Sequence, residues 1–239
     1  KKRTRATIAR EKGLEPLAKI MMKQLERSLE NRAASFLNDQ VASVEDALAG
    51  ARDIVAEWIS ESEKARNIVR RGFEQDAVIY SKVIKGKEEE AAKYRDYFDW
   101  KESLRKCASH RLLAMRRGEN EGFLRVSIEP DADKILTHLN RFFVTGLNSC
   151  ADHVELAVKD SLKRLIQPSI ETEFAALSKE KADEEAIRVF AENIRQLLLA
   201  PPLGQKRVLA IDPGYRTGCK VVCLDEQGNL LHNETIYPH

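Results

Sequence analysis

Residues 207–231 read RVLAIDPGYRTGCKVVCLDEQGNLL and contain two apolar runs separated by a Pro-Gly turn. Residues 208–211 form a short, continuous apolar run, which is typical of a strand buried on both faces. Pro213 and Gly214 then interrupt this run, and Asp212 stands where it stops. A carboxylate at a strand end can be exposed while its backbone is held fixed. Asp212 is therefore a candidate catalytic or ligand-binding residue.

A second apolar run at 219–224 is followed by turn-forming residues at 225–229 and by a third candidate strand at 230–237. Three such strands in sequence resemble the opening meander of a ribonuclease-H-like or actin-like α/β domain. The third strand leads directly to His239, whereas a ribonuclease-H-like domain needs roughly 100 residues. We therefore expect a fragment that holds only the first strands of such a domain.

The composition of the whole chain favours a mainly α protein. Of its 239 residues, 43% are hydrophobic, 33% are charged and 6% are aromatic, which favours solvated helices over a β sandwich. The net charge of +2 indicates no class of partner by itself. No apolar run approaches the roughly 18 residues that span a bilayer, and the basic start is not followed by an apolar signal core. We expect a cytoplasmic protein that does not contact membranes.

The first half of the sequence contains amphipathic helices. Apolar residues recur at spacings of three and four over 14–25 and over 44–59. Ser43 and Asp46 fit a capping pair at the start of the second of these helices. Gly50 inside that helix costs roughly 1 kcal/mol relative to alanine. We interpret it as a point of close helix packing.

The rest of the chain alternates between strand and helix patterns. Residues 77–84 predict either a strand or a loop that crosses the core, and residues 87–104 predict a further helix. Residues 123–128 predict a short strand, and residues 131–199 predict a second helical block. The prolines and glycine of residues 201–206 end the last helix.

These patterns divide the chain into three parts. We expect a helical region over 1–118, a second helical region with a short strand over 119–200, and a linker with the truncated β segment over 201–239.

The cysteines do not indicate a metal site. Cys107, Cys150, Cys219 and Cys223 include no C-x-x-C pair, and no histidines stand near them at zinc-ligand spacing. Cys219 and Cys223 would lie roughly 13 Å apart on one strand, too far to bind one ion. We expect reduced, buried thiols and no metal or cofactor.

The sequences of several segments resemble those of known families. Residues 211–218, IDPGYRTG, are similar to the D-P-G-x-R-x-G start of the YqgF branch of the ribonuclease-H-like superfamily, which is related to RuvC-type resolvases. Five upstream segments occur in an order that resembles the bacterial Tex family: RTRA at 3–6, GLEPLA at 13–18, ALAGARDI at 47–54, KYRDYF at 93–98 and SHRLLAMRRG at 109–118. Tex proteins are transcription accessory proteins. The resemblance extends over essentially the whole chain.

The resemblance implies a nucleic-acid-binding function. Proteins of this family carry helix-hairpin-helix and S1 modules after the YqgF-like domain, and the S1 module is an OB-type barrel that reads nucleic acid. We therefore expect the full-length protein to bind RNA or DNA mainly through modules absent here, and to contact the transcription machinery. The chain itself is expected to act as a helical scaffold without catalysis, with Asp212 as the vestige of a nuclease centre.

Two alternatives start from the same β segment. In the first, the protein is a metal-dependent nuclease or resolvase, and Asp212 is the first of several carboxylates that hold two metal ions. Asp225 and Glu226 fall in the predicted turn and are expected to be solvated. In the second, an actin-like phosphate loop binds ATP. Residues 215–216 disrupt that loop by standing between its glycine and its threonine, which argues against ATP binding.

Two basic clusters are candidates for phosphate contact. Residues 1–12 carry six cations and one acid, and residues 105–117 carry five cations and no acid. Solvated positions or helix ends would explain the same residues, and no aromatic residues are interleaved for single-strand reading. Arg216 suits either a nucleic-acid phosphate or an ion pair with Asp212 or Asp225. The candidates for nucleic-acid contact are Arg3, Arg5, Arg111, Arg116, Arg117 and Arg216.

Overall fold

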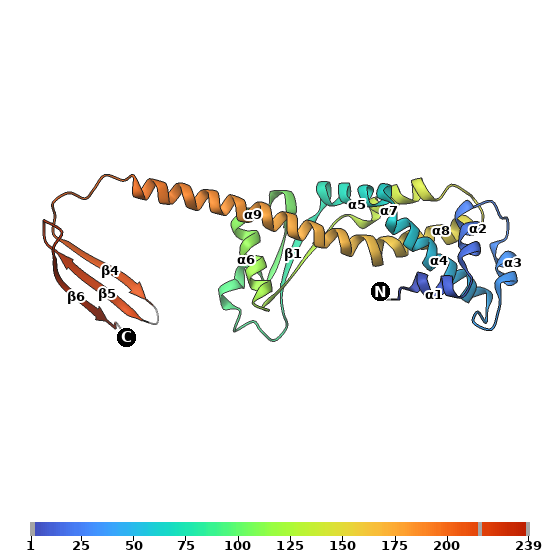
Figure 1. The fold of residues 1–239 in the computed structure, drawn as a ribbon, viewed down its shortest axis with the longest axis horizontal. Coiled ribbons are helices and arrows are strands. Elements are labelled where there is room, and N and C mark those ends of the chain that lie inside the picture. The colour runs from blue at the N-terminus through green and yellow to red at the C-terminus, as the bar shows by residue number, and fades with distance from the viewer. Residues whose placement is uncertain (1–2, 215–216, 238–239) are drawn as a thin grey trace. The chain divides into compact units, whose positions relative to one another are not determined.

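The computed structural model describes residues 3–214 and 217–237 and divides the chain into two units, Lys1–Ile187 and Arg188–His239 (Figure 1). The first unit contains most of the helices and one small sheet, and the second contains a separate antiparallel sheet. This arrangement confirms the predicted fold class of a multi-helix region followed by the first strands of an α/β domain. No helix among the described residues is long and apolar enough to cross a membrane.

The helices and strands follow one another along the whole chain. The α-helices are α1 (Arg5–Glu11), α2 (Glu15–Lys23), α3 (Leu29–Ala33), α4 (Val44–Glu61), α5 (Glu63–Asp76), α6 (Ser109–Asn120), α7 (Ala132–Phe143), α8 (Ser149–Asp160) and α9 (Gln167–Leu198). The strands are β1 (Val78–Val83), β2 (Asp99–Ser103), β3 (Leu124–Glu129), β4 (Val208–Gly214), β5 (Gly218–Leu224) and β6 (Leu230–Ile236). Short 3-10 helices are η1 (Ala34–Phe36), η2 (Ala92–Tyr97) and η3 (Leu104–Lys106), and η4 (Ser161–Ile166) is a π-helical turn.

Local sequence signals set the start and the packing of α4. The Ser43 hydroxyl oxygen accepts a hydrogen bond from the Asp46 backbone N–H at 3.1 Å, which confirms the predicted cap. A Cβ added at Gly50 would collide with the buried side chain of Leu14. The interpretation of Gly50 as a close-packing position is therefore confirmed.

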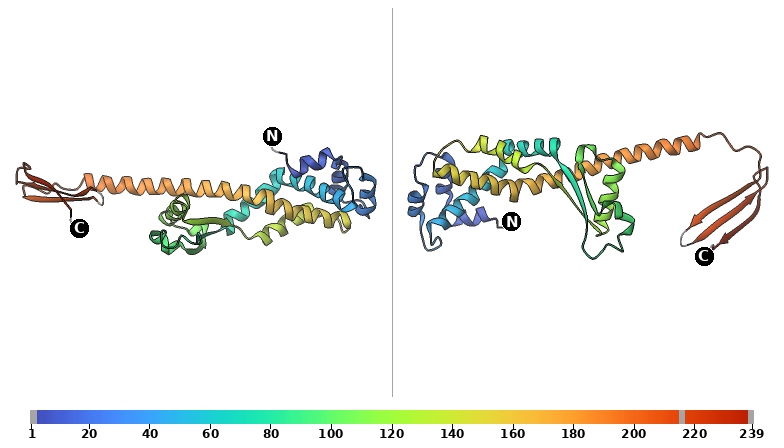
Figure 2. Two further views of the ribbon diagram at one scale, coloured as in Figure 1. Left: turned by 90° about the horizontal axis from the view of Figure 1, so that it is seen from below. Right: turned by 180° about the vertical axis from the view of Figure 1, so that it is seen from behind.

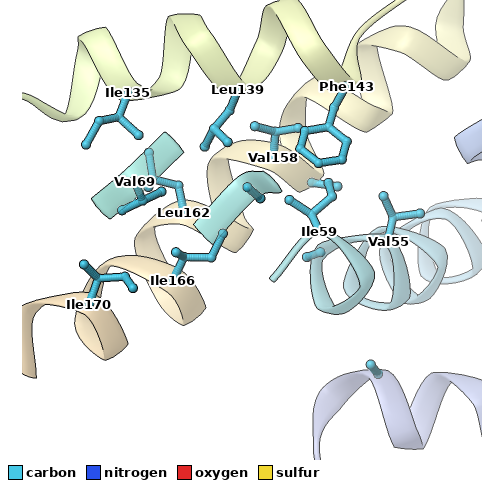
Figure 3. Packing of buried hydrophobic residues seen from close by; sticks show 14 of the residues in the cluster. Val55, Ile59, Val69, Ile135, Leu139, Phe143, Val158, Leu162, Ile166 and Ile170 are labelled. Atoms are coloured by element: carbon cyan, nitrogen blue, oxygen red, sulfur yellow. The ribbon is translucent and has the colours of Figure 1, made fainter. Parts of the chain in front are cut away.

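The core of the first unit lies between helices that are distant in sequence (Figure 3). The part drawn in Figure 3 is formed by apolar side chains of α4, α5, α7, α8, η4 and α9. They include Val55, Ile59, Val69, Ile135, Leu139, Phe143, Val158, Leu162, Ile166 and Ile170, all of which are buried. The helical block predicted over 131–199 is present as α7, α8, η4 and α9. The π turn of η4 stands directly before Pro168, which has no backbone N–H to donate to a regular helix.

The sheet of the first unit has the strand order β2-β1-β3, and both pairings are antiparallel. Of the two possibilities for 77–84, a strand or a loop, the structure has the strand β1, and the strand predicted at 123–128 is confirmed as β3. The helix predicted over 87–104 is wrong, because this segment forms turns, η2 and β2. Pairing of 99–103 with β1 supplies backbone hydrogen bonds that override local helix propensity. Figure 2 shows α6 running beside these strands.

The three-part domain division stays a prediction. In the structure, β1 and β3 lie on either side of residue 118 and share one sheet.

The sheet of the second unit has the order β4-β5-β6, an antiparallel meander that confirms the three predicted strands. The expectation that 208–211 is buried on both faces is wrong, because Leu209 and Ile211 are 64% and 58% exposed. Pro213 and Gly214 also do not end the strand, since β4 continues through Gly214. Strand pairing satisfies the backbone of this run, but burial needs a covering layer, and the described residues provide none over it.

Candidate functional site

Asp212 lies inside β4 and not at its end. The carboxylate is exposed, and its partner across the ladder is Lys220 on β5. Among residues 3–214 and 217–237, no group of three His, Cys, Asp or Glu side chains is placed to hold a metal ion. Arg216, proposed from the sequence to act beside Asp212, lies outside the described residues, as do Lys1 and Lys2.

Asp225 organises the hairpin between β5 and β6. Its Oδ1 accepts hydrogen bonds from the backbone N–H groups of Gln227 at 2.9 Å and Asn229 at 2.7 Å, and its Oδ2 accepts from the Asn229 side chain. Hydrogen bonds from Asn229, first from its side chain, hold the pKa of Asp225 below its usual value. This carboxylate therefore performs the structural role expected of a turn residue.

Arg111 is engaged in an ion pair. From α6 its Nε and Nη2 donate to both carboxylate oxygens of Glu102 on β2, at 3.0 and 2.9 Å. The guanidinium also lies 5.8 Å from the centroid of the Trp100 ring. Burial by itself would raise the pKa of Glu102, but hydrogen bonds from Arg111 and neighbouring groups outweigh it and leave this pKa lowered. Arg111 could contact a phosphate only by giving up this bidentate pair.

Arg116 and Arg117 are adjacent on α6 but differ in their surroundings. The Arg116 side chain is 12% exposed and donates from Nη1 to Glu119 at 2.7 Å. Arg117 is exposed and forms no ion pair within the described part of the chain. Of the three candidates on α6, Arg117 is thus the one that forms no ion pair among the described residues. Lys93 lowers the pKa of Glu121 through a hydrogen bond, and the charge of Arg117 contributes to the same lowering.

The arginines of the N-terminal cluster also differ in whether they form an ion pair. Arg3 pairs with Glu11, whereas Arg5 is exposed and pairs with no carboxylate in the range that the structure describes. Arg5 lines a cavity of about 220 Å³ beside Asp53 and Arg164. Burial raises the pKa of Asp53, and the positive charge of Arg164 opposes this. The cavity therefore combines cations with a partly buried carboxylate and is not uniformly basic.

The cysteines are free thiols, and the expectation that they are buried holds only for Cys150. Cys107, Cys219 and Cys223 are half-buried. Burial, with a further contribution from Glu102, raises the pKa of the Cys107 thiol to about 12. Cys107 therefore stays protonated near neutral pH and is a poor nucleophile.

One basic surface was not predicted from the sequence. Tyr80 and Lys82 of β1, Lys101 of β2 and Arg125 of β3 lie on one face of the first sheet. Alternation within β1 could have placed Tyr80 and Lys82 on the same face. Lys101 and Arg125 join them only through strand pairing, which the sequence did not reveal.

Comparison with known proteins assigns the two units to parts of one protein family. Residues 24–190 match the family model described as Tex central region-like, and residues 206–239 match the Tex protein YqgF-like domain. The first match covers most of the first unit, and the second covers the antiparallel sheet.

Individual relatives align along the whole chain. It is 39% identical to Protein tex of Bordetella pertussis and 38% identical to Transcriptional accessory protein Tex of Neisseria gonorrhoeae, covering 32% of each. It is 28% identical to human S1 RNA-binding domain-containing protein 1 and covers 25% of that protein. The chain thus spans about a third of the length of the bacterial relatives. The central-region match and these identities show that the chain belongs to the Tex family.

Proposed function

We propose that this chain is the helical scaffold of a nucleic-acid-binding transcription accessory protein and that it has no catalytic activity of its own. The names of two relatives support the transcription and nucleic-acid-binding parts of this proposal. One name refers to transcription and the other to RNA binding. Because the chain spans about a third of its bacterial relatives, recognition of RNA or DNA by the whole protein is assigned mainly to other modules. The transcription machinery is the proposed protein partner and the cytoplasm the proposed location.

The observation that carries the proposal is the exposure of Arg5 and Arg117. Neither guanidinium is paired with a carboxylate within the described residues. A cation in this state can neutralise a phosphate without first losing an ion pair, and each neutralised phosphate adds salt-dependent affinity. Arg3, Arg111 and Arg116 would have to exchange a carboxylate for the phosphate. We therefore propose Arg5 and Arg117 as the leading contacts, with the other three arginines as secondary ones.

The surroundings of Asp212 support the non-catalytic part of the proposal. A two-metal nuclease needs several carboxylates around ions that are about 4 Å apart. In the described part of the chain, Asp212 faces Lys220 across the ladder and joins no cluster of three potential ligands. The competing function is a metal-dependent nuclease that uses Asp212 as a ligand.

Binding to labelled single-stranded RNA and duplex DNA across a salt series tests the proposal. We expect salt-dependent binding that weakens in Arg5→Gln/Arg117→Gln, with the slope of log K against log salt falling by about 1.4 for single strands. Arg27→Gln/Lys159→Gln removes two exposed charges elsewhere and serves as the matched control. Absence of binding at low salt would overturn the proposed contacts at Arg5 and Arg117 and leave this chain a scaffold only.

A cleavage assay separates the two candidate functions. The chain is incubated with the same nucleic acids and Mg²⁺ or Mn²⁺, alongside Asp212→Asn. We expect intact substrate with both proteins. Cleavage by the chain that Asp212→Asn abolishes would establish the nuclease function instead.

A further inference from the structure

The β2-β1-β3 sheet has two chemically different faces. Side chains alternate along β1, so Ile79 and Ser81 point to one face and Tyr80 and Lys82 to the other. Ile79 and Ser81 are fully buried, and so is Ile128, the partner of Ile79 on β3. Lys82 is exposed and Tyr80 half-buried. We call the second face, defined by its three strands and by Tyr80, the outer face.

Strand register places three cations on the same face as the Tyr80 ring. Lys101 on β2 is the direct cross-strand partner of Tyr80, and its Nζ lies 5.5 Å from the ring centroid. Lys82 follows Tyr80 by two residues on β1, and Arg125 on β3 is the partner of Lys82. Neighbouring positions on such a face are roughly 5–7 Å apart. Lys101 therefore lies at the Tyr80 ring, and Lys82 and Arg125 occupy nearby positions on the same face.

The charges on this face are not neutralised internally. Lys82, Lys101 and Arg125 are exposed, and none forms an ion pair with any residue that the structure describes. The carboxylates on the same face are Asp99, opposite Lys82, and Glu129, opposite Val78. Glu129 accepts a hydrogen bond from Ser127 at 2.9 Å. The centre of the outer face thus combines a ring with excess positive charge, and its acids lie at two corners.

Single-stranded nucleic acid has the chemistry that matches this combination. Bases stack on aromatic rings without regard to sequence, while cations alongside contact the phosphates. A duplex keeps its bases stacked inside and cannot present one to Tyr80. An acidic peptide would pair with the cations, but its carboxylates have no flat ring that could stack on Tyr80. Arg5 and Arg117 lack an aromatic partner in the described contacts, so the outer face differs from them in kind.

We propose that the outer face binds single-stranded nucleic acid, with Tyr80 stacking on a base and Lys82, Lys101 and Arg125 contacting phosphates. This inference rests on the proposed function, because it names a surface through which the scaffold would contact nucleic acid. It predicts sequence-tolerant binding with a preference for single strands over duplexes.

Binding of the 239-residue chain to a fluorescently labelled oligouridine, followed by anisotropy across a salt series, tests the proposal. Tyr80→Thr removes the ring but keeps a good strand former, and we expect its Kd to rise about 5- to 100-fold, whereas Tyr80→Phe retains binding. We expect Lys82→Gln/Lys101→Gln/Arg125→Gln to lower the salt slope by about 2. The control Lys23→Gln/Arg27→Gln/Lys159→Gln removes equal charge from exposed positions outside the sheet.

The outcomes distinguish this inference from the proposed function. Binding that both outer-face variants preserve but Arg5→Gln/Arg117→Gln weakens would overturn the inference and leave the proposed function standing. No binding by the unmodified chain would overturn both the inference and the proposed contacts at Arg5 and Arg117. A third outcome is that the triple variant loses binding, Tyr80→Thr keeps it, and polyglutamate competes as well as unlabelled oligouridine. The outer face would then be a general polyanion-binding surface, and the stacking proposal would be overturned.

A second measurement does not depend on the variants folding. Photo-cross-linking of the unmodified chain to an oligonucleotide that carries 5-iodouridine is followed by peptide mapping. We expect the cross-link in the peptide that contains Tyr80. Efficient cross-links only to peptides outside the three strands would contradict the proposal.

Discussion

The central strand of the first sheet, β1, and an edge strand of the second, β4, differ in how far their apolar side chains are buried. Both β1 and β4 carry apolar residues, yet Ile79 is fully buried whereas Ile211 is 58% exposed. β1 has a strand on each side, and α6 packs beside its sheet, while β4 pairs only with β5. An apolar run thus specifies an extended backbone, but burial of its side chains depends on a second layer. The first unit supplies that layer from its own described residues, and the second does not.

The largest expected effect is at Phe73, in the core of the first unit. Its side chain is 1% exposed, and its ring centroid lies 5.1 Å from that of Phe174. We expect Phe73→Ala to lower the free energy of unfolding by about 3–5 kcal/mol. Trp58 and Trp100 both belong to this unit, so tryptophan fluorescence in urea measures the change.

Phe142→Ala is the matched control for that measurement. Phe142 is 40% exposed on α7, with the Lys64 Nζ 3.7 Å from its ring centroid. We expect a loss of about 1 kcal/mol or less. Equal losses at Phe73 and Phe142 would show that the first unit does not have the well-packed core assigned to it.

A smaller effect is expected at Gln24, the buried polar residue that holds the segment after α7. Its Nε2 donates to the Phe143 carbonyl at 2.7 Å, and its Oε1 accepts from the N–H groups of Thr145 at 2.9 Å and Gly146 at 3.0 Å. We expect Gln24→Ala to lower the free energy of unfolding by about 2–4 kcal/mol, because these backbone groups lose their partners.

Gln24→Gly separates the hydrogen bonds from the backbone conformation. Gln24 has a φ of 55°, a conformation that glycine adopts without strain. The decrease in the free energy of unfolding should therefore be about 1 kcal/mol smaller in the glycine variant than in the alanine variant. If alanine and glycine were both neutral in urea unfolding, this network would not stabilise the first unit.

The ion pair between Arg111 and Glu102 predicts a pH dependence. The pKa of Glu102 is lowered in the folded chain, so its contribution to stability is present above its unfolded pKa of about 4.3 and is lost as pH falls through the lower, folded value. We expect Glu102→Gln to cost about 1–3 kcal/mol at pH 7, because it removes the charged partner of Arg111. The difference from the unmodified chain should narrow in urea unfolding series below about pH 4.3. A difference that is constant from pH 7 to pH 3 would contradict this account.

The smallest effect is expected on β4, the other side of the comparison. Leu209 is 64% exposed, so Leu209→Ala should change the stability of the chain by about 0.5 kcal/mol or less, measured by far-UV circular dichroism during thermal unfolding. A loss of about 2 kcal/mol or more would mean that a covering layer buries this strand in solution.

The features predicted from sequence are those that local chemistry determines. The cap at Ser43, the packing glycine at Gly50 and the three strands of the second sheet follow from residue type and spacing, and the structure confirms each. The Tex resemblance came from short motifs in register, which the family models confirm.

The features missed depend on contacts between distant segments. Residues 99–103 form a strand because their backbone pairs with β1. That strand places Glu102 where Arg111 can pair with it. Tyr80 and Arg125 become neighbours on the outer face only through the register of β1 with β3. Helical spacing and charge counts contain no information on such pairings, so they predict none of the outer-face residues as a phosphate contact.

The most direct test of the account is hydrogen exchange of the whole chain, measured by mass spectrometry with and without oligouridine. We predict slower exchange on binding in peptides that cover 78–83 and 99–103, with no change in peptides that cover 208–214. Protection confined to 208–236, or none at an oligonucleotide concentration that saturates binding, would contradict the claim that the first unit contacts nucleic acid through its sheet.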